Sequence, residues 1–147
     1  MQGFAIRNSS KKNLIPFGDK IILDLLEKGI IAKYSTFGKN IFLESSHKIN
    51  KSIISKYDMY SAIMCTEKEK NIFQNIKKLI ENVDEPTNFA VIVQRKGDQN
   101  YSSTELARNV AGAAFEIWPE IKVNLKKPQL EINVEIINNR TIIYLRN

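Results

Sequence analysis

Cationic and polar side chains surround Gly97, where an apolar run gives way to a helical pattern. Arg95 and Lys96 precede this glycine, which permits a sharp change of chain direction. Ser102 and Glu105 follow at the spacing of a capping box, in which the serine accepts from a helix amide and the glutamate reaches back to the cap. Unpaired amides and the dipole at a helix N-terminus favour an anion. This corner therefore predicts phosphate binding, although many helix starts share the pattern.

The remaining residues offer little for catalysis or for binding a metal. One histidine, His47, and one cysteine, Cys65, cannot form a zinc site of a common type. The sequence contains no GxxxxGK[ST] loop, no GxGxxG and no nucleophile elbow. Cys65 ends an apolar run, which predicts a buried thiol rather than a nucleophile. We therefore expect a non-catalytic protein with no cofactor and no metal.

The composition is that of a soluble globular protein with a basic surface. The 147 residues are 43% hydrophobic and 26% charged, with a net charge of +6. Residues 1–65 carry 10 Lys and Arg against 5 Asp and Glu, so most of the excess lies there. Such a surface attracts polyanions, nucleic acid above all, although many lysine-rich proteins bind nothing anionic. No apolar run approaches ~20 residues and no signal peptide is evident, so we expect a cytoplasmic protein.

The first half of the chain predicts a ferredoxin-like βαββαβ unit over residues 1–65. A helix follows Pro16 and ends near Gly29, which suits a helix C-cap, and Ser46 is placed to cap a second helix. The predicted strands lie at 2–7, 30–36, 39–44 and 59–65.

The second half predicts another α/β unit over residues 66–147, packed on the first, so that the fold class is α+β. A capping box at Thr66 to Glu69 starts its first helix. A single helix is expected from Ser102 to the stop at Pro119. Residues 138–140 form a turn, because asparagine tolerates positive φ. The predicted strands and extended segments are 89–94, 121–125, 130–136 and 141–145.

Residues 66–147 resemble a THUMP domain, the RNA-binding module of tRNA-modifying enzymes. The resemblance runs through TEKEKNIFQNIKKLI, FAVIVQRKG, SSTELARNVAGAAFEIWP, IKVNLKKPQLEINVEI and RTIIYLR. The whole chain is similar to the N-terminal half of tRNA thiouridine synthetases, in which a ferredoxin-like domain precedes the THUMP domain. The family usually carries acids where this sequence has Asn124 and Gln129, which leaves open how their structural role is filled.

The resemblance implies binding of the tRNA acceptor stem and its single-stranded 3′ end. It assigns RNA contact to Arg95, Lys96, Arg108, Lys126 and Lys127, and we expect Tyr101 and Arg140 to contact the RNA as well. Tyr101 is the candidate for stacking on a base. The structural alternatives are a tyrosine packed over the sheet edge, a solvated turn at the two adjacent lysines, and an Arg108 paired with Glu105 or Glu116.

The sequence shows no catalytic domain, so we expect a stand-alone adaptor or one half of a split enzyme. Its expected partners are tRNA and a separate enzyme, for thiolation or cytidine acetylation. The alternative is a protein–protein interaction subunit in which RNA contact is incidental, and an independent enzyme is the third class. An exposed sheet edge would also permit a homodimer.

Overall fold

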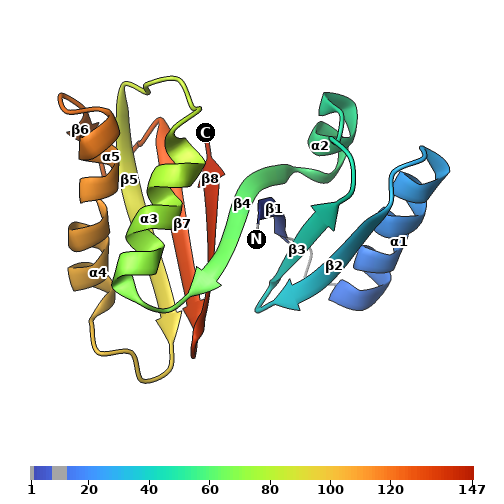
Figure 1. The fold of residues 1–147 in the computed structure, drawn as a ribbon, viewed down its shortest axis with the longest axis horizontal. Helices are drawn as coiled ribbons and strands as arrows, with labels where there is room; N and C mark the ends of the chain where they lie inside the picture. Colours follow the sequence, from blue (N-terminus) through green and yellow to red (C-terminus); the bar gives the residue numbers. More distant parts are fainter. Residues whose placement is uncertain (1, 8–12) are drawn as a thin grey trace. The chain divides into compact units, whose positions relative to one another are not determined.

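The computed structural model describes residues 2–7 and 13–147, and the chain divides into two compact units, Gln2–Ala62 and Ile63–Asn147 (Figure 1). The division falls inside one strand, β4, close to the boundary expected after residue 65. The first unit contains β1 (Gln2–Arg7), α1 (Leu14–Glu27), β2 (Ala32–Phe37), β3 (Asn40–Ser45), α2 (Lys51–Tyr57) and the start of β4 (Met59–Thr66).

The first unit has the predicted ferredoxin-like arrangement. Its strands run in the order β2-β3-β1-β4, and β3 pairs antiparallel with both β1 and β2. The side chain of Asn13 caps α1 by accepting from the Ile15 amide at 3.1 Å, and Gly29 follows the helix at φ +77°. The core joins both helices to the sheet through Ile6, Ile21, Leu25, Ile30, Ile41, Leu43, Ile49, Ile53, Tyr57 and Met59.

The second helix starts later than the sequence analysis predicted. Ser46 does not cap it, because its hydroxyl donates to the Ile31 carbonyl oxygen at 3.0 Å. Asn50 is the cap instead, and its side-chain oxygen accepts from the Ile53 amide at 3.0 Å. Both residue types favour helix caps, so tertiary contact with the chain near Ile31 decided between them.

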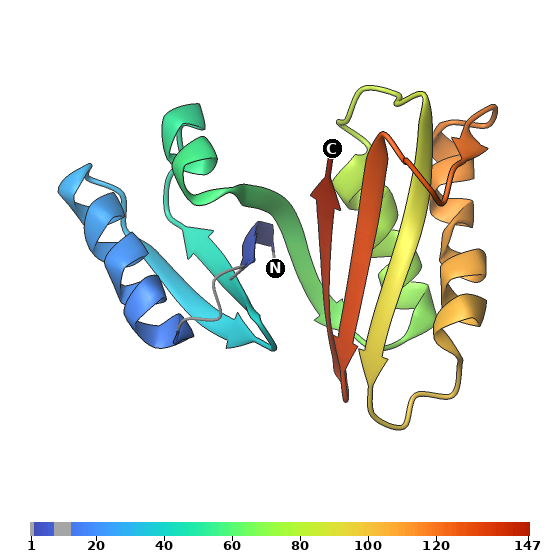
Figure 2. The ribbon, with the colours of Figure 1, turned by 180° about the vertical axis from the view of Figure 1, so that it is seen from behind.

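The second unit places its helices on one face of a sheet, as Figure 2 shows from the open side. Its strands run in the order β4-β8-β7-β5-β6; β5 is parallel to β6 and β7, and β7 is antiparallel to β8. Its further elements are α3 (Glu69–Ile80), β5 (Asn88–Lys96), α4 (Ser103–Val110), α5 (Gly112–Ile117), β6 (Lys122–Val123), β7 (Leu130–Ile137) and β8 (Arg140–Arg146).

Two helix predictions in the second unit were wrong in detail. The capping box at Thr66 is not formed: α3 starts at Glu69, and the Thr66 hydroxyl accepts from the Asn71 side chain at 2.6 Å. The single helix after Ser102 is two helices, α4 and α5, which meet at Ala111. Gly112 follows this break, and a Cβ there would lie 3.2 Å from the Phe73 ring of α3. The small residues therefore allow close helix packing but weaken the helix locally.

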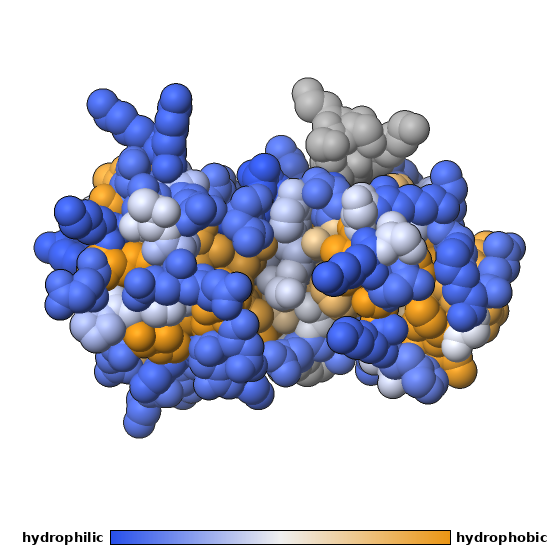
Figure 3. Space-filling model, turned by 90° about the horizontal axis from the view of Figure 1, so that it is seen from above, coloured by the Kyte–Doolittle hydropathy of each residue, from blue (hydrophilic) through white to orange (hydrophobic). Residues whose placement is uncertain are grey.

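Among the described residues, Ile31, Ile92 and Phe115 are exposed large apolar side chains, and other such side chains gather in two places. One is α1, where Ile15, Leu23 and Leu26 are each more than half exposed. The other is the end of the second unit that bears β6, where Val123 and Leu125 are exposed. Figure 3 shows apolar atoms between hydrophilic ones on both units. In the part of the chain that the structure describes, no helix is both long and apolar enough to cross a membrane.

Asp24 ties α1 to α2 in a way that depends on pH. Its carboxylate accepts hydrogen bonds from Lys28 at 2.5 Å, Lys56 at 2.8 Å and the Tyr57 hydroxyl at 2.5 Å. These donors, Lys28 first, hold the pKa of Asp24 well below its usual range. Because the folded pKa lies below the unfolded one, the stabilisation is complete above about pH 4 and is lost as the pH falls further.

We therefore expect Asp24→Asn to lower the melting temperature at pH 7, and the difference from the wild type to shrink as the pH falls from about 4 to 2. Circular dichroism melts across this range would measure it. Glu27→Gln, which changes an exposed carboxylate on the same helix, is the control and should have little effect at pH 7. A deficit for Asp24→Asn that stays constant with pH would contradict the assignment.

Candidate nucleic-acid interface

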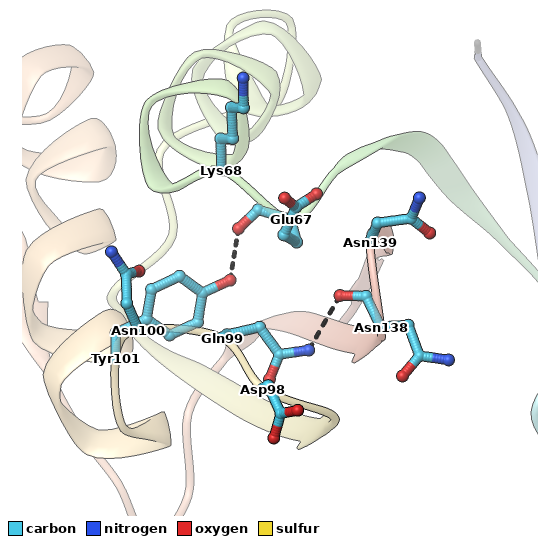
Figure 4. Close-up of a pocket in the computed structure, with 8 residues that line it drawn as sticks. All are labelled: Glu67, Lys68, Asp98, Gln99, Asn100, Tyr101, Asn138 and Asn139. Atoms are coloured by element: carbon cyan, nitrogen blue, oxygen red, sulfur yellow. Dashed lines mark hydrogen bonds between the residues drawn. The ribbon is translucent and has the colours of Figure 1, made fainter.

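Three connections meet at one end of the second unit, where β4, β5 and β7 end (Figure 2). They are the β4–α3 junction, the loop from β5 to α4, and the turn from β7 to β8. A cavity of about 520 Å³ lies between them (Figure 4). It is lined by Glu67, Lys68, Asp98, Gln99, Asn100, Tyr101, Asn138 and Asn139. Most of these side chains are neutral and polar, and they can donate or accept hydrogen bonds.

The side chain of Gln99 holds two of these connections together. Its amide nitrogen donates to the Lys96 carbonyl oxygen at 2.7 Å and to the Asn138 carbonyl oxygen at 2.9 Å (Figure 4). Its amide oxygen accepts from Arg95 at 3.2 Å. The Asn138 amide also donates to the Lys96 carbonyl oxygen at 2.8 Å. The β5–α4 loop and the β7–β8 turn are therefore one hydrogen-bonded structure, in which Arg95 takes part.

Gly97 is the residue that makes this arrangement possible. Its φ of +114° is strained for any residue with a Cβ. A Cβ there would also lie 2.8 Å from the Asn138 side-chain oxygen and 3.0 Å from the Gln99 side-chain nitrogen. The sharp change of direction predicted at Gly97 is thus confirmed, and the close approach of the turn adds a second reason for glycine.

Tyr101 lies in the hydrophobic core. Only 9% of the residue is exposed, and its hydroxyl donates to the Glu67 carbonyl oxygen of the β4–α3 junction (Figure 4). Burial, and after it the charge of Glu67, raises the pKa of Tyr101. In this structure the ring offers little surface to a base. Tyr101 links the loop to the core instead, which is the packing alternative considered from the sequence.

The first turn of α4 follows the loop directly. The Ser102 hydroxyl accepts from the Glu105 amide at 3.0 Å, so the predicted serine cap is confirmed. The other amides of this first turn point towards the same end of the unit as the cavity, which suits an anion beside it.

Exposed cations surround this end of the unit. Lys68, Lys96 and Arg140 are all exposed, and the side chain of Lys68 extends outward in Figure 4. Arg140 pairs with Ile137 across the β7–β8 hairpin, which brings it to the end at which β5 finishes. Its guanidinium lies 3.7 Å from the Met64 sulfur. The structure thus brings together Arg95, Lys96 and Arg140 of the predicted contacts.

Arg108 lies farther from the cavity, in the last turn of α4. It is exposed, and among residues 2–7 and 13–147 it forms no ion pair. The alternative partner Glu116 pairs with Lys77 at 3.0 Å instead. The contact of Arg108 with RNA stays a prediction.

Lys126 and Lys127 lie at the opposite end of the sheet. They precede β7, and the nearby Asn124 amide donates to the carbonyl oxygen of Phe89, near the start of β5. Nine residues of β5 separate that end from Lys96, a distance of about 26 Å in an extended strand. One phosphate group cannot contact both sets of cations, so the two lysines form a separate surface, whose RNA contact stays a prediction.

Asn124 and Gln129 act as backbone acceptors around these lysines. The Asn124 side-chain oxygen accepts from the Lys126 and Lys127 amides at 3.0 and 3.1 Å. The Gln129 side-chain oxygen accepts from the Thr87 amide at 2.5 Å. An amide oxygen thus provides at each position an acceptor that a carboxylate could also provide, which answers the question raised by the missing acids.

Sequence reasoning missed most of the residues that line the cavity. Gln99, Asn100 and Asn139 belong to polar loops, and their types alone do not mark them. The usable signal was the Asn138-Asn139 turn, because a hairpin turn beside a basic loop can place amide groups near it. Its pairing with the Gly97 loop depends on strand order, which the sequence does not state.

Cys65 is partly buried, and burial raises the pKa of its thiol to about 11. It is therefore protonated at neutral pH and not poised as a nucleophile, in agreement with the prediction. Within the described ranges 2–7 and 13–147, no three His, Cys, Asp or Glu residues are grouped so that they could hold a metal ion.

Gly97→Ala should destabilise the protein by about 1–3 kcal/mol, because it combines an unfavourable φ with a contact that must be relieved. Urea unfolding would measure the loss. Gly29→Ala is the matched control: its φ is +77°, but a Cβ there has nothing within 4 Å. It should cost less, since it introduces backbone strain alone. Equal losses would mean that the Asn138 and Gln99 contacts contribute nothing.

Comparison with known proteins finds relatives that are named tRNA sulfurtransferases. A tRNA sulfurtransferase of Vibrio campbellii is 34% identical over 70 residues, which are 48% of this chain and 14% of that protein. The probable tRNA sulfurtransferase of Mycoplasmopsis pulmonis is 29% identical over 85 residues, 56% of this chain and 22% of that protein. The chain thus spans less than a quarter of the length of these two relatives.

Two solved structures share the fold. A 4-thiouridine synthetase in a complex with RNA and bound ATP matches with a TM-score of 0.69 at 11% identity. The match covers 99% of this chain and 41% of the synthetase chain. The protein PH1313 from Pyrococcus horikoshii has a TM-score of 0.67 at 18% identity, with 99% and 54% covered. Residues 66–146 match the model of the THUMP domain family, and these residues make up more than half of the chain. The protein therefore belongs to the THUMP-domain family.

Proposed function

We propose that this protein binds tRNA at the acceptor stem and 3′ end, and presents it to a separate modification enzyme without performing the reaction itself. The observation that carries the proposal is the joint placement of exposed cations and an amide-rich cavity at one end of the THUMP unit. Two relatives named as tRNA sulfurtransferases and a structural neighbour crystallised with RNA support the choice of ligand.

In this proposal the exposed cations and the cavity bind different parts of the RNA. Lys68 lines the cavity, Lys96 and Arg140 are exposed at the same end of the unit, and these cations would grip phosphates without reading sequence. The cavity itself contains Glu67 and Asp98, which repel a phosphate but accept hydrogen bonds from the amino groups of bases and from ribose hydroxyls. An unpaired nucleoside therefore fits the cavity better than a phosphate, and a single-stranded 3′ end supplies one.

The chemistry of these residues supports the presenting role. The candidate site binds and orients, and none of its side chains forms a nucleophile–base pair of the kind used in covalent catalysis. The thiolation or cytidine acetylation chemistry is assigned to the partner enzyme, and the THUMP protein contributes affinity for the substrate and its orientation.

Binding through about four to six phosphates predicts a strong dependence on salt. The logarithm of the association constant should fall with the logarithm of salt concentration at a slope of roughly −3 to −5, because each contact releases condensed counterions. Fluorescence anisotropy with labelled tRNA between about 50 and 300 mM KCl would measure it. A flat response would favour the alternative in which the protein is an interaction subunit and RNA contact is incidental.

Substitutions of Lys96 and of Arg95 should have different effects on tRNA affinity and on melting temperature. Lys96→Ala should weaken tRNA binding and make the salt slope shallower by about 1, with no change in melting temperature. Within residues 2–7 and 13–147, the Lys96 ammonium has no hydrogen-bond or ion-pair partner. Arg95→Ala should lower both tRNA affinity and melting temperature, because it also removes the hydrogen bond to Gln99. Unchanged affinity in Lys96→Ala would place the RNA elsewhere.

A further inference from the structure

The segment Lys122–Gln129, which we name the β6–β7 segment, exposes apolar side chains among cations. Val123 is 50% exposed and Leu125 is 77% exposed. Lys122, Lys126 and Lys127 lie in the same segment, and no acidic residue occurs between Ile121 and Leu130. The segment therefore combines an apolar tip with three positive charges, at the end of the second unit that faces the viewer in Figure 3.

Hydrogen bonds hold this segment in one conformation. The Asn124 amide donates to the Phe89 carbonyl oxygen at 2.9 Å, while its side chain accepts from the two amides that follow Leu125. The Gln129 amide donates to the Asn88 side-chain oxygen at 2.7 Å. Leu125 thus projects from an ordered turn, and a partner that buries it would have little loop entropy to overcome.

A further exposed apolar side chain, Phe115 of α5, is linked to this segment through the buried ring of Phe89. Val123 is the strand partner of Phe89, whose ring meets that of Phe115 edge to face, with centroids 5.5 Å apart. Phe115 is itself 39% exposed. Large apolar side chains near the centre of a patch with a charged rim are typical of sites that bind proteins.

We propose that the β6–β7 segment docks on a protein partner, with Leu125 entering an apolar pocket whose rim carries aspartate or glutamate. The three lysines argue for the acidic rim, since opposite charges speed association and exclude other partners. The exposed leucine argues against RNA as the occupant, because a phosphate backbone gains nothing from an aliphatic side chain. The proposal rests on the proposed function in one respect: the partner is the separate modification enzyme.

Its place in the fold agrees with such a role. The segment adjoins the start of β5, and the candidate RNA interface adjoins the end of the same strand. Bound RNA and a docked protein would therefore occupy different ends of the THUMP unit. The exposed leucines of α1 in the first unit lack this one-sided charge, because Asp19, Asp24 and Glu27 alternate there with lysines.

The test begins with a photo-crosslinking amino acid at position 125 of the whole protein in its own cells, and with position 23 as a matched control. Leu23 is an exposed leucine of similar accessibility, at 60%. The protein captured at position 125 is identified, purified and titrated against the wild type. Affinity for tRNA is measured in parallel, so that failure of docking and failure of RNA binding are distinguished.

The expected result is a specific protein captured at position 125 whose purified form binds the wild type. Leu125→Asp should weaken that complex at least tenfold and leave the melting temperature and the tRNA affinity unchanged, whereas Leu23→Asp should have no effect on the complex. Lys126→Glu with Lys127→Glu should also weaken it and reduce its dependence on salt. Capture of RNA, of a second copy of this chain or of nothing would overturn the proposal, as would equal losses for Leu125→Asp and Leu23→Asp.

Discussion

The candidate interface depends on a small set of hydrogen bonds that join two loops from distant parts of the chain. Gln99 donates to carbonyl oxygens on both sides of the gap between the end of β5 and the β7–β8 turn. The Lys96 carbonyl oxygen also accepts from the Asn138 backbone amide at 2.8 Å, so backbone and side-chain hydrogen bonds hold the loops together. A flexible loop would lose more entropy when a ligand bound. Gly97 permits the close approach of the β7–β8 turn to the β5–α4 loop. The Tyr101 hydroxyl donates a hydrogen bond that joins the same loop to the β4–α3 junction. The cations are therefore displayed on a preorganised surface.

These hydrogen bonds give the basic residues of the loop different roles. Arg95 has a structural part, because it donates to Gln99, whereas Lys96 is exposed at the end of the same strand. The cavity beside them is lined by Glu67 and Asp98 as well as by Lys68 and several side-chain amides. In the proposed binding mode, exposed cations hold phosphates and the cavity accepts an unpaired nucleoside, as a single strand leaving a duplex would require.

The two ends of β5 provide different chemistry. At one end, polar side chains and cations surround a cavity; at the other, an ordered turn presents Leu125 and two lysines. A rigid strand of nine residues separates them. A protein that presents a substrate to an enzyme needs both kinds of surface, and it needs them apart, so that binding of the substrate does not cover the docking site. The proposed RNA interface and the proposed docking segment lie at opposite ends of β5 in one sheet.

Local sequence patterns were enough to predict both units, the ferredoxin-like order, the Gly97 turn, the Ser102 cap and the Asn138 turn, because each depends on neighbouring residues or on a short hydrophobic period. Tertiary structure decided what depends on strand order and on competition between equally suitable residues. It selected Asn50 over Ser46 as a cap, broke the helix after Ala111, buried Tyr101 and set Lys126 near the opposite end of β5 from Lys96, with a strand about 26 Å long between the two ends. It also joined Gln99 to Asn138, 39 residues later, since parallel pairing of β5 with β7 brings their ends together and no local pattern encodes that pairing.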